Sequence, residues 1–318
     1  MEILTESALE PKVGADVLSV AVRATTFDGV KPLSEQTVLD IGRMPAEVAS
    51  DSQNRHLVVV DQPGEINASV LAYAHLEHGD GEAASAEIVV HPDHRRQGHG
   101  TALLNALREL SPQVRVWSHG QTDAAKAFAE RFDLQVVREL FQMSRPLGPD
   151  APPLAEVSLP EGFSLRSFEV GRDEQHWLAV NAAAFVDHPE QGRVTLSDLK
   201  DRISEPWFDP HGFLLIEDAN QSAARLAAFH WTKVEAAEPG SSQPADGEVY
   251  VVGVDPDYQG LGLGKAATLA GLHHLQACRL PAATLYVDGD NGAAVATYTK
   301  LGFERSALDV MYAPSAGQ

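Results

Sequence analysis

The apolar and polar residues of this chain follow two periods, which predict strands and helices in a repeating order. Short runs that are apolar and β-branched, or that alternate, are typical of strands. They lie at 57–60, 69–75, 86–90, 114–117, 134–143, 163–168, 213–216, 226–234, 249–254, 283–287 and 303–312. Apolar residues at helical spacing predict helices at 14–26, 34–43, 101–110, 123–131, 174–185, 196–203, 265–276 and 293–301. Interspersed strands and helices predict an α/β fold with a mixed sheet.

The order of elements occurs twice, and the two halves align. The run I-V-V-H-P-D, which begins at Ile88, matches V-G-V-D-P-D, which begins at Val252. The first is followed by R-x-x-G-x-G at 95–100, and the second by Q-x-x-G-x-G at 259–264. A repeat of this length that contains both strands and helices indicates duplication of a whole domain.

A stretch rich in proline separates the halves. Residues 146–154 read P-L-G-P-D-A-P-P-L, which can continue neither a helix nor a central strand. A chain of 318 residues is long enough for two domains of about 150 residues each. We therefore predict a domain at 1–145, a linker at 146–158 and a second domain at 159–318.

The second half contains a strand, a glycine-rich turn and a helix start, in that order. The strand ends at Asp255-Pro-Asp, and the glycines of 259–264 follow. Glycine lets a backbone approach a ligand, and the first amides of a helix favour an anion. Lys265 is followed by Ala266, so the Lys-Ser/Thr ending of a P-loop is absent. An anion cradle and an ordinary tight turn both fit this pattern.

This pattern resembles the Q/R-x-x-G-x-G/A motif of the GNAT N-acetyltransferases, which cradles the pyrophosphate of acetyl-CoA. The resemblance implies two tandem GNAT domains and acetyl-CoA as co-substrate, without a metal. The implied cofactor contacts in the second half are Val252, Gly253, Val254, Gln259, Gly260, Leu261, Gly262, Leu263, Gly264, Lys265, Asn291, Gly292, Ala293, Ala294, Val295 and Ala296. Those in the first half are Ile88, Val89, Val90, Arg96, Gln97, Gly98, His99, Gly100 and Thr101.

Acyl transfer from a thioester to an amine needs a base for the ammonium and a proton donor for the leaving thiolate. Glu248, at the start of the strand before the turn, is the candidate base, although a strand-end carboxylate is often only solvated. Tyr298 is the candidate donor, although a tyrosine there can also be structural. Gly253 within a β-branched run predicts a bulge that separates this strand from its neighbour. Asn291 either caps the next helix or bonds the cofactor.

The two halves differ in the residues that this chemistry needs. Aligning the helices at 293–301 and 123–131 puts Ala129 where Tyr298 stands and Thr122 where Asn291 stands. The first half keeps the cradle and lacks the proton donor. We therefore expect the first domain to bind CoA without catalysis and the second to be catalytic.

Composition limits the partners and the compartment. The net charge is −21, from 24 basic and 45 acidic side chains, which disfavours nucleic acid as a partner. Cys278 is the one cysteine, so an internal disulfide is impossible and a reducing cytosol fits. The sequence has neither a secretory signal pattern nor an apolar run of about 18 residues. We expect a cytoplasmic monomer that binds no membrane.

Several phrases resemble the mycothiol synthases of actinobacteria. They are H-P-E-Q-G at 188–192, W-F-D-P at 207–210, F-H-W-T-K-V at 229–234, G-E-V-Y-V-V-G-V-D-P at 247–256 and L-Y-V-D-G-D-N at 285–291. The resemblance implies acetyl transfer from acetyl-CoA to the cysteine amine of desacetylmycothiol, with the substrate between the domains. The implied substrate contacts are Glu35, Glu190, Lys233, Glu248 and Tyr286. An acetyltransferase for another small amine or a protein N-terminus, and a CoA-sensing module with two inactive sites, are the alternatives.

Overall fold

The computed structural model describes residues 2–44, 53–62, 68–78, 83–186, 191–220, 225–235 and 246–315. They form two compact units. The first unit contains Met1–Leu140 together with Ala307–Gln318, and the second contains Phe141–Ser306. The predicted linker at 146–158 falls in the second unit, and the predicted domain boundaries stay a prediction.

The first unit is built on a mixed sheet. Its strands are β1 (Glu2–Glu6), β2 (Arg55–Val60), β3 (Val70–Glu77), β4 (Ser85–Val90), β5 (Arg115–Ser118) and the later part of β12 (Glu304–Pro314). They lie in the order β1-β2-β3-β4-β5-β12. Strands β4 and β5 are parallel, and the other neighbours in this order are antiparallel. A mixed sheet in this unit agrees with the predicted fold class.

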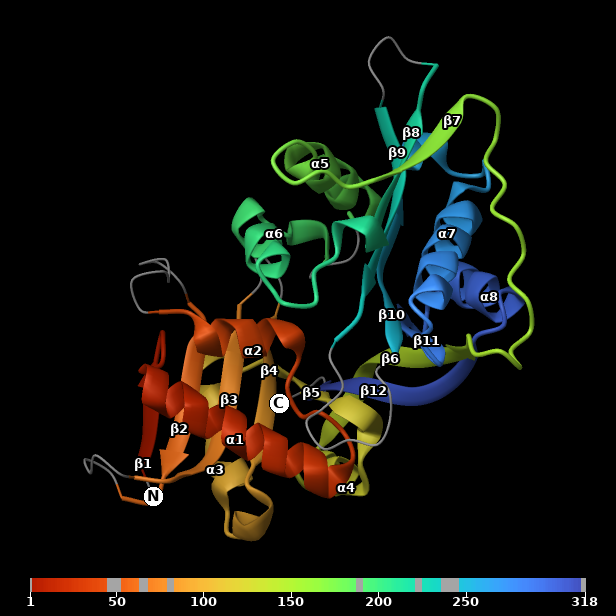
Figure 1. The fold of residues 1–318 in the computed structure, drawn as a ribbon. Coiled ribbons are helices and arrows are strands. Elements are labelled where there is room, and N and C mark those ends of the chain that lie inside the picture. The colour runs from red at the N-terminus through yellow and green to blue at the C-terminus, as the bar shows by residue number, and fades with distance from the viewer. Residues whose placement is uncertain are drawn as a thin grey trace. The chain divides into compact units, whose positions relative to one another are not determined.

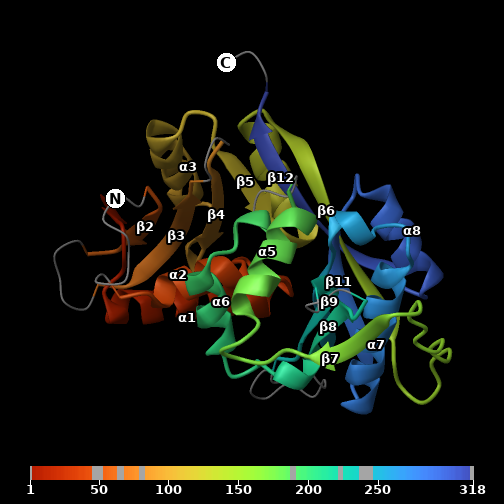
Figure 2. The same cartoon turned by 90° about the horizontal axis from the view of Figure 1, so that it is seen from above.

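Helices cover both faces of the first sheet. They are α1 (Pro11–Asp28), α2 (Glu35–Gly42), α3 (His99–Leu110) and α4 (Asp123–Arg131). Helices α1 and α2 lie on one face and α3 on the other (Figures 1 and 2). Val17 of α1 packs in one core with Tyr73, while Leu103 of α3 packs in another with Leu57. The apolar stripes of the helices thus meet the alternating side chains of the strands.

Two strands pass from one unit into the other. Strand β6 (Leu134–Pro146) begins in the first unit and ends in the second, whereas β12 begins in the second and ends in the first. In the first unit, residues 310–312 of β12 pair with residues 116–118 of β5. In the second unit, β6 lies beside β11 (Ala282–Asp288). Each half of the sequence therefore completes its sheet with the final strand of the other half.

The second unit repeats this architecture. Its further strands are β7 (Phe163–Ser167), β8 (Phe213–Asp218), β9 (Arg225–Lys233) and β10 (Gly247–Val254), in the order β6-β11-β10-β9-β8-β7. Its helices are α5 (Glu174–Ala184), α6 (Leu196–Ile203), α7 (Leu263–Ala277) and α8 (Gly292–Lys300). Helices α5 and α6 lie on one face of this sheet, and α7 and α8 on the other (Figure 1).

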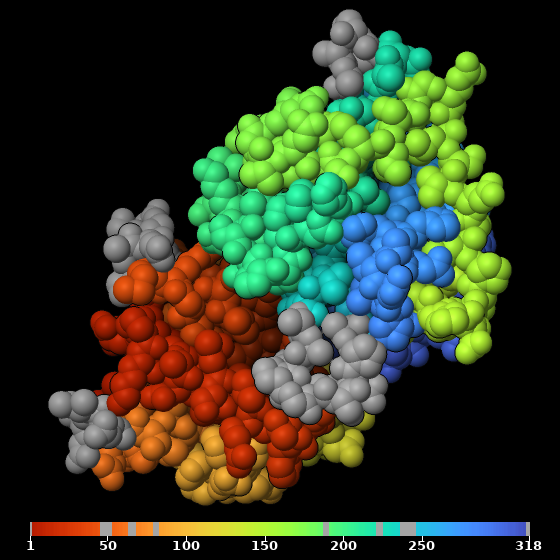
Figure 3. Space-filling model, viewed as in Figure 1, coloured from red at the N-terminus to blue at the C-terminus, as the bar shows by residue number. Residues whose placement is uncertain are grey.

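Short 3-10 turns occur at Pro92–His94, His119–Gln121, Gln191–Arg193, Pro210–Gly212 and Pro256–Tyr258. Helices α1, α5 and α6 make up much of the visible surface of their own units (Figure 3). None of the helices in the described residues combines the length and the apolar character that a membrane crossing requires.

Candidate active site

The glycine-rich turn of the second unit leads from β10 into α7. Gly260 and Gly262 have φ angles of 80° and 81°, in the left-handed region that favours glycine. The Ala266 N–H makes the first helical bond, 3.1 Å long, to the Gly262 carbonyl, so the amides before it have no ladder partner. A Cβ placed at Gly260 or Gly262 would meet no described atom within 4 Å. The open turn can therefore hold a phosphate at the positive end of α7.

Strands β10 and β11 pair at one end and then separate. The pairing involves Gly247 and Glu248 of β10, and within the described residues it stops there. Further along, Val252–Val254 pair with β9 on the other side. The edge of β10 that faces β11 is thus available to an extended ligand that carries amide groups, as pantetheine does. The separation predicted from the sequence is present.

Strand β10 carries a bulge, but at another position than the sequence predicts. The register with β9 shifts between Val249 and Val251, which makes Tyr250 the extra residue. Gly253 pairs with Phe229, and a Cβ there would lie 2.5 Å from the Phe229 ring. Packing requires this glycine, so the prediction of a bulge at Gly253 is wrong. The bulge puts Tyr250 and Val251 together in the aromatic core beside α5.

Three predicted substrate contacts lie on one face of the second sheet. Glu248 is the cross-strand partner of Lys233. Its neighbour Val249 packs in the core that contains residues of α7 and α8, and alternation therefore puts Glu248 on the face of α5 and α6. Tyr286 follows Thr284, the partner of Glu248 on β11, by two residues and shares this face. Its side chain is exposed, and its Oη accepts a 3.2 Å bond from Gln142.

Tyr298 lies on the opposite face, on α8. Its half-buried ring packs edge-on against Phe303 at 5.8 Å, in the same core as Leu285. Burial raises the pKa of the Tyr298 phenol to about 12, so the group is protonated at neutral pH. The candidate base and the candidate acid thus lie on opposite faces of the sheet.

Asn291 begins α8 as its cap. Its side-chain oxygen accepts a 3.1 Å bond from the Ala294 N–H, which confirms the capping interpretation. Residues 292–296 form the first turn of the helix that it caps. Contact between these residues and a cofactor stays a prediction.

The first unit has the corresponding turn, in which one of the two glycines with a positive φ is replaced. Gly98, with φ 93°, stands where Gly262 stands, but Arg96, with φ 62°, replaces Gly260. A cavity of about 710 Å³ adjoins the turn. All nine predicted first-half contacts line it, together with Thr122 and Ala129, which replace the second-half asparagine and tyrosine. The structure thus brings the predicted first-half residues together around one cavity.

Sequence reasoning missed a buried ion cluster beside this cavity. His119, which lines the cavity, bonds Glu87 at 2.9 Å and Asp309 at 3.1 Å. Burial opposes the charge of the imidazole, but hydrogen bonds to these two carboxylates raise its pKa to about 10. Asp309 belongs to β12, so this cluster needs residues 190 positions apart, which no local pattern reveals.

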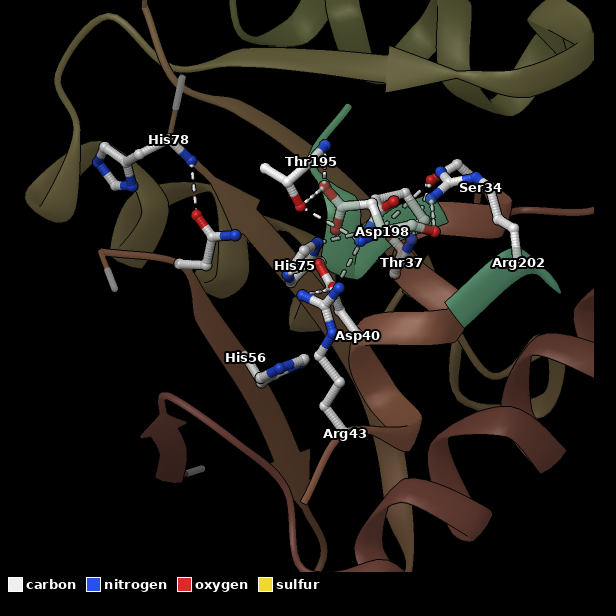
Figure 4. Close-up of polar contacts among 12 residues, drawn as sticks. Ser34, Thr37, Asp40, Arg43, His56, His75, His78, Thr195, Asp198 and Arg202 are labelled. Carbon is white, nitrogen blue, oxygen red and sulfur yellow. Dashed lines mark hydrogen bonds and ion pairs between the residues drawn. The ribbon is translucent and has the colours of Figure 1, made fainter. Parts of the chain in front are cut away.

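A second polar cluster lies between α2 and β3 in the same unit (Figure 4). His75 Nδ1 lies 3.1 Å from Thr37 Oγ1, and Asp40 pairs with Arg43 at 2.9 Å. Burial lowers the pKa of both His75 and His56 to about 4, so both rings are neutral at pH 7. These contacts fix α2, whose first residue is Glu35.

Glu190 and residues 236–245 lie outside the described residues.

Comparisons with known proteins agree with this geometry. Residues 177–303 match the acetyltransferase (GNAT) family, and residues 52–133 match an acetyltransferase (GNAT) domain. A tandem GNAT protein from the clavulanic acid biosynthesis pathway has a similar solved structure. Its TM-score is 0.68 and its identity 19%, with 100% of this chain and 99% of that chain covered. The tandem GNAT architecture predicted from the repeat is confirmed.

Two curated relatives are similar over nearly their whole length. The mycothiol acetyltransferase of Thermomonospora curvata is 47% identical, covering 98% of this chain and 96% of the relative. That of Nocardiopsis dassonvillei is 48% identical with the same coverage.

Proposed function

This chain belongs to the mycothiol acetyltransferase family, and from that premise we propose that it acetylates the cysteine amine of desacetylmycothiol with acetyl-CoA. The products are mycothiol and CoA. The observation that carries the proposal is the match over 98% of the chain at 47–48% identity, which includes both units. The separated strands beside an open glycine turn support acetyl-CoA as the donor.

We assign the chemistry to the second unit. Amides of α7 and the turn hold the pyrophosphate, and the free edge of β10 pairs with the pantetheine arm. An N–H near Val252 donates to the thioester oxygen, where negative charge develops. These contacts place the carbonyl carbon in the gap between β10 and β11.

We assign the proton transfers to Glu248 and Tyr298, which lie on opposite faces of the sheet. Glu248 takes a proton from the substrate ammonium, directly or through water, and the neutral amine attacks the carbonyl carbon. A C–N bond forms, and the C–S bond breaks as the intermediate collapses. Tyr298 gives its proton to the departing thiolate, and the Tyr298 phenolate takes back, directly or through water, the extra proton that the new amide nitrogen loses. Because the pKa of the Tyr298 phenol is about 12, the group is protonated at neutral pH, which is the form that a proton donor needs.

The substrate contacts follow from the resemblance and from the shared face. A cysteinyl glucosaminyl inositol offers one ammonium group and many hydroxyl groups. Carboxylates can accept hydrogen bonds from both, and tyrosine and lysine can donate hydrogen bonds to the hydroxyl oxygens. Glu248 and Tyr286 present such groups on one face of the sheet, and the buried Lys233, also proposed as a contact, is the cross-strand partner of Glu248 on that face. Glu35 and Glu190 are proposed as further contacts.

We propose that the first unit binds CoA in its cavity without transferring acetyl groups. Ala129 supplies no proton donor at the place of Tyr298. The glycine turn and the cavity of the first unit otherwise suit the binding of CoA.

A thiol-release assay with acetyl-CoA tests the function. Wild-type protein is expected to release CoA with desacetylmycothiol far faster than with simple amines, aminoglycosides or peptide N-termini. Glu248→Gln and Tyr298→Phe are each expected to lower kcat by about 10²–10⁴-fold, the usual contribution of a general base or acid. A preference for another amine would favour the alternative acetyltransferase, and unchanged turnover in either variant would remove that residue from the mechanism.

A further inference from the structure

Lys233 is a buried cation in the middle of an aromatic cluster. Only 6% of its side chain is exposed. Its Nζ lies 5.0 Å from the centre of the Trp207 ring and 5.5 Å from that of Tyr250. Both distances are within the range of cation–π attraction, and a desolvated ammonium gains most from it. Glu235 pairs with the same Nζ at 2.8 Å.

The two rings are themselves held in place. Trp207 and Tyr250 pack against each other at 5.2 Å, and each also contacts Trp231. Tyr250 Oη accepts a 2.7 Å bond from Arg202 Nε. Tyr250 reaches this position because it is the bulged residue of β10. The bulge thus serves to bring an aromatic ring against Lys233.

Lys233 lies directly opposite Glu248 across the antiparallel pair. Directly opposed side chains in such a pair have Cβ atoms about 4.5–5.5 Å apart. An ammonium near a carboxylate favours the ionised carboxylate and disfavours a second cation. The charged groups around Lys233 include Glu235, Glu248 and, through Tyr250, Arg202.

We propose that Trp207 and Tyr250 are positioning residues that hold the Lys233 ammonium beside Glu248, where it keeps the base ionised and the bound substrate amine deprotonated. The inference rests on the proposed function, in which Glu248 is the base. A buried ion pair is weak evidence for stability, because apolar residues of similar volume often replace one without loss. The contacts around Lys233 are therefore better explained by the proposed role of Glu248 as the base than by a contribution to stability.

The first test needs no substrate. The carboxyl ¹³C shift of Glu248, assigned by its loss in Glu248→Gln, is followed against pH in the full-length protein. Lys233→Met is expected to move the titration of Glu248 upward by about one pH unit. Trp207→Leu is expected to move it in the same direction, because the ammonium is no longer fixed. Trp207→Phe keeps an aromatic face and is expected to restore the wild-type titration.

Phe208→Leu is the matched control. Phe208 packs edge-on against Trp231 at 5.9 Å in the same cluster, whereas the Lys233 ammonium lies over the rings of Trp207 and Tyr250. Phe208→Leu is expected to lower the unfolding temperature as Trp207→Leu does, while the pH at which Glu248 titrates is unchanged. An equal titration shift in both leucine variants, or no shift in Lys233→Met, would overturn the inference.

The second test uses turnover. The acid limb of the kcat–pH profile reports groups in the enzyme–substrate complex. It is expected to move upward in Lys233→Met and Trp207→Leu, and the double variant is expected to match Lys233→Met. A further shift in the double variant would show that Trp207 does not act through Lys233. If Glu248 titrates as expected but desacetylmycothiol is not acetylated, the proposed function fails while the inference on Glu248 stands.

Discussion

Arg96 adopts a backbone conformation for which the second unit uses glycine. Its φ is 62°, against 80° for Gly260 at the matching place. A residue with a Cβ in this region costs about 1–2 kcal/mol. Because Arg96→Gly and Arg96→Ala both remove the guanidinium, their difference isolates the backbone. We expect the glycine variant to have the larger unfolding free energy, by about 1 kcal/mol, in urea denaturation. Equal values would mean that the turn relaxes around Arg96.

His119 gives the first unit a pH dependence on the alkaline side. Its pKa is about 10 in the folded protein against 6.5 for an ordinary histidine. The folded state therefore holds this proton more tightly, and the stabilisation is complete below pH 6.5 and is lost as the pH rises through 10. We expect the unfolding temperature to fall across this window in the wild type and to fall less in His119→Gln, as measured by calorimetry. Parallel curves would contradict a charged His119.

At the scale of elements, the last two glycines of the glycine-rich turn in the second unit have different structural roles. Gly262 has φ 81°, so a Cβ there strains the start of α7, whereas Gly264 lies within the helix, 3.4 Å from Val254 with a Cβ added. We expect Gly262→Ala to lose about 1 kcal/mol of stability and to raise the KM for acetyl-CoA several-fold. Gly264→Ala is expected to keep its stability or gain up to about 1 kcal/mol. Titration of acetyl-CoA in the thiol-release assay compares them, and equal KM values would refute the distinction.

Most elements could be predicted from local periodicity, because the strands and helices of both units have clear apolar patterns. Helix α4 and helix α6 begin and end at the predicted residues. Strand β1 was not predicted, because its five residues are mostly exposed and carry a carboxylate at each end. The bulge was assigned to Gly253 rather than Tyr250, because a glycine required by an approaching ring resembles one required by a bulge.

The candidate site was predicted as far as it depends on short motifs. The cavity of the first unit contains all nine predicted residues, since a strand, a turn and a helix start are contiguous in sequence. The cluster of His119, Glu87 and Asp309 was missed, because it joins three separate segments. The aromatic cluster around Lys233 was missed for the same reason, since Trp207 and Tyr250 come from separate segments of the chain.

At the scale of the whole molecule, the exchange of β6 and β12 could not be predicted. The two halves are similar, and an apolar strand pattern does not specify which sheet the strand joins. In the structure, Val310 and Tyr312 of β12 are buried in a core of the first unit together with Val116 and Ala129. The first unit therefore depends on residues more than 160 positions after its other strands.

A truncated chain tests this dependence. Ending the chain after Ser306 removes one of the two strand partners of β5, three buried apolar side chains and Asp309. We expect hydrogen exchange in β4 and β5 to lose its protection, while β8 and β9 keep theirs. A chain that ends after Ser315 keeps these residues and is the matched control. Retained protection of β4 and β5 after the shorter truncation would show that the first unit folds without β12.

The exchange also sets an order of events on the ribosome. Domains generally fold as they emerge, the N-terminal one first. Here the segment at 307–315 is translated only after the whole of the second unit, yet it closes the sheet of the first. During synthesis of the second half, the edge of β5 that pairs with β12 therefore stays unpaired. Unpaired strand edges can associate with strands of other chains. Slow synthesis of the second half should lengthen the period during which the newborn protein needs chaperone protection.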